Sequence, residues 1–234
     1  MRGQSPVLRR LIKVSAVVIG AGLVLTGCGS VKWGSAAIVG NQRITIATLD
    51  TEVTNLSQAV KLYPGVVPLN ATQQTQETLS WLVRFQINEQ LARQAGITIS
   101  AAQAQAALAQ IYSAAKSEAE SEGISNVTLK LILAANGIPP NRSAELGRYQ
   151  AIENEFVKQA NGGTIPTATA AQSAVTAKLQ RAQCTAAKSL KIQINPQFGQ
   201  LNYSSYQIVA APSAVVRTQG PAKAPSTAGL TPAC

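Results

Sequence analysis

Residues 70–95 constrain the fold most, because they predict a helix that is apolar on two faces. A helix of this kind usually lies at the centre of a bundle, since each apolar face needs a partner. Gly96 can end the helix as a residue with a left-handed backbone. We therefore expect other helices to pack around this one. The apolar residues of the two faces are Leu79, Val83, Ile87 and Leu91 on one and Trp81, Phe85 and Ala92 on the other.

Short β-segments are predicted at both ends of a helical sequence. Residues 36–39 and 42–45 flank Gly40-Asn41, a two-residue turn typical of a β-hairpin. Residues 190–195 alternate between polar and apolar, as in a strand with one buried face. The sequence thus predicts a mainly α fold, closed by a small β-sheet of the N-terminal hairpin and the C-terminal strand. The predicted helices cover residues 46–60, 70–95, 101–122, 126–136, 142–160 and 168–189.

The N-terminus has the pattern of a bacterial lipoprotein signal. Residues 1–13 carry four basic residues and no acid, residues 14–25 are apolar, and Leu-Thr-Gly-Cys follows, ending at Cys28. This predicts a signal peptide over 1–27, lipid on Cys28, a tether over 28–35 and a place on the extracytoplasmic face of a cell membrane. The alternative is a plain secreted protein in which Cys28 is accidental. The pair Arg9-Arg10 leaves both general and twin-arginine export open.

Charge is distributed unevenly along the chain. The predicted mature part has 16 basic and 10 acidic residues, and every acid lies between Asp50 and Glu155. The basic C-terminal third could contact an anionic membrane surface or acidic clients, or it could be a solvated basic face. We expect no nucleic-acid partner, because the export signal and the lack of a recognised motif argue against one.

Histidine is missing from the chain, which limits the chemistry that it can perform. Ser-His and Cys-His catalysis and the commonest metal ligand are excluded. Two thiols without histidine do not make a zinc site, so we expect no catalytic residue, metal or cofactor. Cys184 and Cys234 could form a disulfide in an oxidising compartment, although Cys234 ends a Pro- and Ala-rich segment.

Three stretches together resemble the N-terminal chaperone domain of SurA-like periplasmic proteins. They are AAIVGNQRIT, ETLSWLVRFQINEQLARQAGITIS and KIQINPQFG, in that order. The resemblance covers residues 36–208 and leaves 209–234 as a disordered tail. Gln197 departs from the arginine usual in the last stretch. SurA itself also carries parvulin prolyl-isomerase domains, for which this chain has no room, so the resemblance implies no enzyme activity.

The resemblance implies that unfolded or extended exported polypeptides bind to an apolar helical surface, without catalysis or a cofactor. Such binding needs exposed apolar area with few fixed polar partners. Exposed Trp81 and Phe85 would contribute to it, but both could instead belong to the core. The alternative function is that of a structural or assembly adaptor that binds one folded partner. The oligomeric state stays open. The candidate client-binding residues are Trp81, Phe85, Ile111 and Tyr112.

Overall fold

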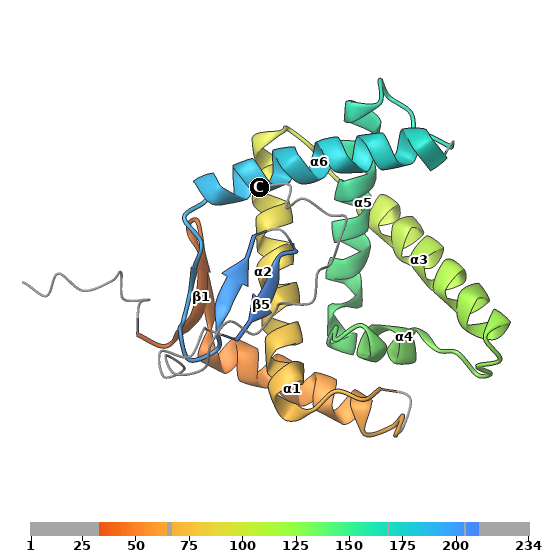
Figure 1. Cartoon of the computed structure of the whole chain (residues 1–234). Coiled ribbons are helices and arrows are strands. Elements are labelled where there is room, and N and C mark those ends of the chain that lie inside the picture. The colour runs from red at the N-terminus through yellow and green to blue at the C-terminus, as the bar shows by residue number, and fades with distance from the viewer. Residues whose placement is uncertain (1–32, 65–66, 168, 204, 211–234) are drawn as a thin grey trace, which may run out of the picture. The chain divides into compact units, whose positions relative to one another are not determined.

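The computed structural model describes residues 33–64, 67–167, 169–203 and 205–210 (Figure 1). The chain divides into a unit of residues 1–30 and a unit of residues 31–234, and all the described residues belong to the second unit. The predicted signal peptide, Cys28 and most of the predicted tail lie outside the described residues.

Helices dominate the described part of the chain, so the predicted mainly α fold is confirmed. No helix in this part is both long and apolar enough to cross a membrane. The elements are β1 (Ser35–Val39), β2 (Gln42–Thr45), α1 (Ile46–Val60), α2 (Ala71–Gln94), α3 (Ala101–Ser121), α4 (Leu129–Ala135), the 3-10 helix η1 (Pro140–Arg142), α5 (Ser143–Ala160), α6 (Thr169–Ser189), β3 (Gln193–Ile194), β4 (Gln200–Asn202) and β5 (Gln207–Val209).

The predicted sheet joins the two ends of the helical region. Its strand order is β2-β1-β3, and β1 is antiparallel to both neighbours. Gly40 turns the hairpin with a φ of 59°, which glycine adopts without steric cost. Ala37 pairs with Ile194, which lies at the far end of the helical region in the sequence. The sheet of hairpin and C-terminal strand is therefore confirmed.

The third strand is shorter than the predicted strand over residues 190–195. The Leu190 amide donates to the Ala187 carbonyl at 3.1 Å and so continues the last turn of α6. Lys191 then has a φ of 51°, a left-handed conformation that interrupts an extended backbone. Pairing with β1 consequently begins only at Gln193.

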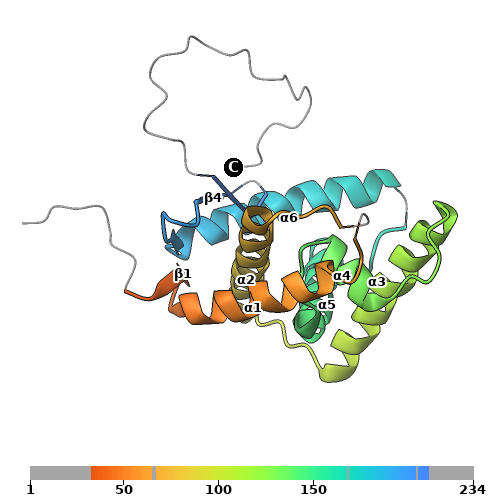
Figure 2. The same cartoon turned by 90° about the horizontal axis from the view of Figure 1, so that it is seen from below.

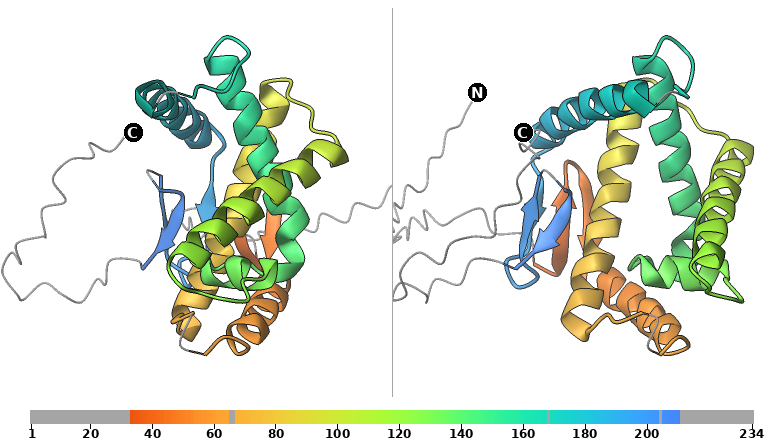
Figure 3. Two further views of the ribbon diagram at one scale, coloured as in Figure 1. Left: turned by 90° about the vertical axis from the view of Figure 1, so that its right-hand side faces the viewer. Right: turned by 45° about the vertical axis from the view of Figure 1, so that its right-hand side comes forward.

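Helix α2 lies at the centre, as its two apolar faces predict. Figures 1 and 3 show β1 and the β4–β5 hairpin on one side of α2 and α5 on the other. Figure 1 shows α6 near one end of α2 and α1 near the other, and Figure 2 looks nearly along α2, with α1 and α6 on either side of it. Two hydrogen bonds fix the start of α2. The Asn70 side chain accepts one from the backbone amide of Gln73, and the Gln73 side chain accepts one from the backbone amide of Asn70. The buried residues of α2 reach three separate apolar clusters.

Helix α3 packs along α5 at very short range (Figure 3). The approach is possible because position 147 in α5 is glycine. A Cβ added at Gly147 would lie 2.4 Å from the Ala104 carbonyl oxygen of α3. The glycine at position 147 thus sets how closely α3 can lie to α5.

Helix α4 is shorter than the predicted 126–136. Asn126 has a φ of 59°, and the Thr128 side chain caps the helix, so the helix begins only at Leu129.

The β4–β5 hairpin is an element that was not predicted from the sequence. Its strands pair antiparallel, and Ile208 is buried in the same apolar cluster as Leu79 and Val83 of α2. The Ile208 amide donates to Ser80 Oγ at 2.8 Å, and Arg84 donates to the carbonyl of Tyr206. The domain therefore continues to Val209, and the hairpin attaches the end of the described chain to α2.

Candidate functional site

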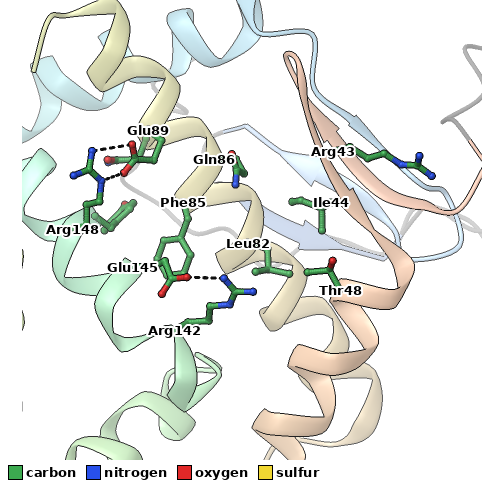
Figure 4. Close-up of a pocket in the computed structure, with 12 residues that line it drawn as sticks. Arg43, Ile44, Thr48, Leu82, Phe85, Gln86, Glu89, Arg142, Glu145 and Arg148 are labelled. Carbon is green, nitrogen blue, oxygen red and sulfur yellow. Dashed lines mark hydrogen bonds and ion pairs between the residues drawn. The ribbon is translucent and has the colours of Figure 1, made fainter. Parts of the chain in front are cut away.

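A pocket of about 230 Å³ opens between β2, α1, α2 and α5 (Figure 4). Each of these elements supplies side chains to its wall, so the pocket exists only in the folded domain. The residues that line it are Arg43, Ile44, Thr48, Leu82, Phe85, Gln86, Asn88, Glu89, Arg142, Glu145, Arg148 and Tyr149.

The floor of the pocket is apolar. Ile44 reaches it from β2, because alternation along the strand places that side chain on the inner face. Leu82 and Phe85 reach it from α2, three residues apart on one helix face. All three are less than one-tenth exposed, and Tyr149 adds an aromatic ring from α5. The floor is firmly packed and suits an apolar group.

Arg142 forms one wall by bridging two carboxylates. Its Nη2 lies 2.6 Å from Glu52 Oε1 on α1, and its Nη1 lies 2.6 Å from Glu145 Oε1 on α5. The Asn141 amide also donates to Glu52, at 3.2 Å. The hydrogen bond to Glu52 raises the pKa of Arg142 despite the opposing effect of burial. The bridge ties α1 to the start of α5, with one positive charge shared by two carboxylates.

Arg148 forms the opposite wall. Its guanidinium donates to both oxygens of Glu89 on α2, as the dashed lines in Figure 4 show. A third donor, Nη1, reaches the Ile99 carbonyl at 2.9 Å. Bidentate arginine–carboxylate pairs hold a fixed geometry. The pair therefore fixes the distance between α2 and α5 across the pocket.

The pocket combines an apolar floor with walls that carry ion pairs. Gln86 and Thr48 add polar groups at its edge. Such a lining can accept one apolar side chain while the backbone of an extended segment contacts the polar edge. In the described ranges no group of three or more His, Cys, Asp or Glu residues could hold a metal ion.

Three of the four predicted client-binding residues come together, but mainly as core. Trp81, Phe85 and Ile111 share one apolar cluster, in which Phe85 is 7% exposed. The rings of Trp81 and Phe85 lie 5.6 Å apart. The Trp81 indole donates to the Asn136 carbonyl at 2.8 Å, and Arg84 lies over its ring. This environment favours the core interpretation of Trp81 and Phe85, although Phe85 also contributes to the pocket floor.

Tyr112 is not a member of this cluster but lies at its border. It lines an open groove of about 410 Å³ between α3 and α4, together with Leu108 and Leu129. Its hydroxyl donates to the Val127 carbonyl at 3.1 Å. A role of Tyr112 and Ile111 in client binding stays a prediction.

Cys184 is a disulfide-bonded residue of α6. Its Sγ lies 3.7 Å from the Tyr203 carbonyl oxygen, where α6 meets the end of β4. Cys28 and Cys234 both lie outside the described residues, so the pairing of Cys184 with Cys234 stays a prediction.

The charged walls of the pocket were not predicted from the sequence. The burial of Glu52 could have been predicted, because Glu52 lies three residues after Leu49 and four before Leu56, on the apolar face of α1. A carboxylate on such a face points to a buried pair. Its partner, Arg142, is 90 residues away, which no local pattern reveals.

Comparison with known proteins agrees with the architecture. The chain matches the SurA-like N-terminal domain over residues 7–156, well over half of its length. The match ends within α5, so α6 and the C-terminal strands lie beyond it. No curated protein and no solved structure matches the chain.

The match sets the general type of the protein. The SurA-like N-terminal domain is non-catalytic, and no parvulin domain was found in the chain. The domain carries a chaperone-like or adaptor role in general terms. By its sequence match and its helical architecture, this chain belongs to the SurA-like N-terminal domain family.

Proposed function

We propose that the protein is an extracytoplasmic chaperone-like lipoprotein that binds unfolded exported polypeptides without catalysis. The observation that carries the proposal is the pocket between β2, α1, α2 and α5, with its apolar floor and paired charges. Family membership supports the same class of function. The apolar floor of this pocket and a separate groove between α3 and α4 provide contacts that many sequences can satisfy.

The test fills the pocket without removing a core side chain. Gln86 lines the pocket and is half-buried, so Gln86→Trp should occupy the space meant for a client side chain. We expect the variant to suppress aggregation of a chemically unfolded model protein about tenfold less well, which corresponds to about 1.4 kcal/mol of binding. Gln94→Trp is the matched control, since Gln94 is exposed on the same helix and does not line the pocket.

Two outcomes separate the proposal from its alternative. Equal suppression by both tryptophan variants and by the wild type would remove the pocket from client binding. A wild-type protein that never suppresses aggregation, and instead copurifies with one folded protein, would establish the adaptor function.

The proposed membrane anchor rests on the sequence around Cys28. A thiol directly after Leu-Thr-Gly and a short apolar run is the expected site of lipid attachment. Cys28→Ser should move the protein from the membrane fraction to the soluble fraction and remove the mass of the lipid. The measurement is cell fractionation with mass spectrometry of the purified chain. Membrane retention of Cys28→Ser with an unchanged, lipid-sized mass would refute the anchor.

A further inference from the structure

A second polar site lies where α2, α5, α6 and the β4–β5 hairpin meet. Two adjoining cavities there, of about 280 and 20 Å³, share four lining residues. The shared residues are Tyr149, Glu153, Gln183 and Tyr206. Neither the pocket between β2, α1, α2 and α5 nor any pattern in the sequence accounts for this arrangement.

Glu153 is the chemical centre of the site. Its carboxylate accepts hydrogen bonds from Asn88 Nδ2 on α2 and from Gln183 Nε2 on α6, the latter at 2.8 and 3.0 Å. Burial raises the pKa of Glu153, although these two hydrogen bonds lower it. No salt bridge joins Glu153 to a cation within the described part of the chain. A carboxylate held away from water by neutral amides alone is costly to keep ionised.

Two further polar atoms beside Glu153 are buried and without a hydrogen-bond partner. One is Oδ1 of Asn88, a residue that is only 4% exposed and lines the smaller cavity. The other is the hydroxyl of Tyr206. Buried polar groups in folded proteins almost always have partners, and both residues line the smaller cavity, so these two atoms are open to a partner from that cavity. A carboxylate and an amide oxygen can only accept, and a hydroxyl can accept as well. A ligand that pairs with these groups must therefore donate.

Aromatic rings complete the walls. Tyr149, Tyr203 and Tyr206 line the larger cavity, and burial together with the nearby Glu153 charge raises the pKa of Tyr149 to about 12. Tyrosine rings attract cations placed over their faces. Arg84 also reaches the smaller cavity, but its guanidinium donates to the carbonyls of Ser205 and Tyr206. It holds the hairpin and leaves the Glu153 carboxylate unneutralised.

We infer that this site binds a cationic side chain, lysine or arginine, of an extended polypeptide, with Glu153 as its counter-charge. The inference rests on the proposed polypeptide binding and adds a preference to it. An arginine guanidinium offers five donors in a fixed plane, enough for Glu153 and the Tyr206 hydroxyl, which both line the larger cavity. The pocket between α1 and α5 would take apolar side chains, and this second site would select segments that carry a positive charge.

The experiment compares arginine with its neutral isostere citrulline. Fluorescently labelled, end-capped heptapeptides that differ only at the central residue are titrated against the full chain by anisotropy. We expect the arginine peptide to bind about tenfold more tightly than the citrulline peptide, since a hydrogen bond between two charged groups is stronger than one from a neutral donor. Glu153→Gln should abolish this ratio. Glu155→Gln is the matched control on the same helix, because Glu155 pairs with Lys158 at 2.5 Å and lies outside the site.

The outcomes are distinct. Equal binding of the two peptides to the wild type overturns the inference, and this comparison needs no variant that could fail to fold. A ratio that persists in Glu153→Gln overturns it too, as does failure of all peptides to bind. A tenfold arginine preference in a protein that does not suppress aggregation would sustain this inference while rejecting the proposed chaperone function.

Discussion

Replacing Phe85 by Ala should lower the free energy of unfolding by about 3–5 kcal/mol, as expected for a buried aromatic residue. The side chain is 7% exposed and packs with Leu133, Ile138 and Leu146. Its ring also lies 6.0 Å from that of Tyr149, so truncation removes contacts with both α4 and α5. Chemical denaturation followed by circular dichroism measures the loss.

Trp33→Ala is the control for this substitution. Trp33 is 98% exposed, so its removal should change the free energy of unfolding by no more than about 0.5 kcal/mol. If Phe85→Ala is as stable as the wild type but binds clients less well, Phe85 is a client contact and the core interpretation is wrong. If it is destabilised as expected, losses of client binding in this variant cannot be assigned to a direct contact.

Replacing Arg142 by Met should lower the free energy of unfolding by about 2–3 kcal/mol. Breaking a fully buried ion pair costs about 3–5 kcal/mol, because the remaining charge is left without a partner. The side chain of Arg142 is 26% exposed, which reduces the cost, but that of Glu52 is only 4% exposed. Among the described residues, Glu52 would keep the longer hydrogen bond from Asn141 and no cation. Urea denaturation measures the change.

Two comparisons test the cause of that loss. Adding Glu52→Gln to the Arg142→Met variant removes the stranded charge and should recover part of the stability. Lys158→Met breaks a more exposed pair with Glu155 and should cost no more than about 1 kcal/mol. A loss in Arg142→Met no greater than that in Lys158→Met would show that the Glu52 bridge contributes little.

The parts of the fold that depend on sequence patterns of a few residues could be predicted. Helices α1 and α3 begin at the predicted residues, where the Thr45 side chain caps α1 and Ser100 and Gln103 cap α3 reciprocally. The two apolar faces of α2 predicted its central position. The β4–β5 hairpin was missed, although Leu201 and Ile208 are apolar positions on either side of a polar turn. Three-residue strands are too short for alternation to be recognised.

The candidate sites were much less predictable than the fold. Trp81 and Phe85 were found because large aromatic residues stand out on a helix face, but the same pattern fits core and surface. The polar residues of both sites gave no comparable signal. Arg148 and Glu89, for example, occupy ordinary positions in their helices until α2 and α5 lie side by side.

The sequence by itself determined the helices, their caps and the closing of both chain ends into one sheet. Caps and periodicity act over three or four residues, so local chemistry decides them. Only the tertiary structure decided that Arg142 meets Glu52 and that Glu153 meets both Asn88 and Gln183. These contacts depend on how helices pack, and packing is set by all the side chains at each interface together, including the glycine at position 147.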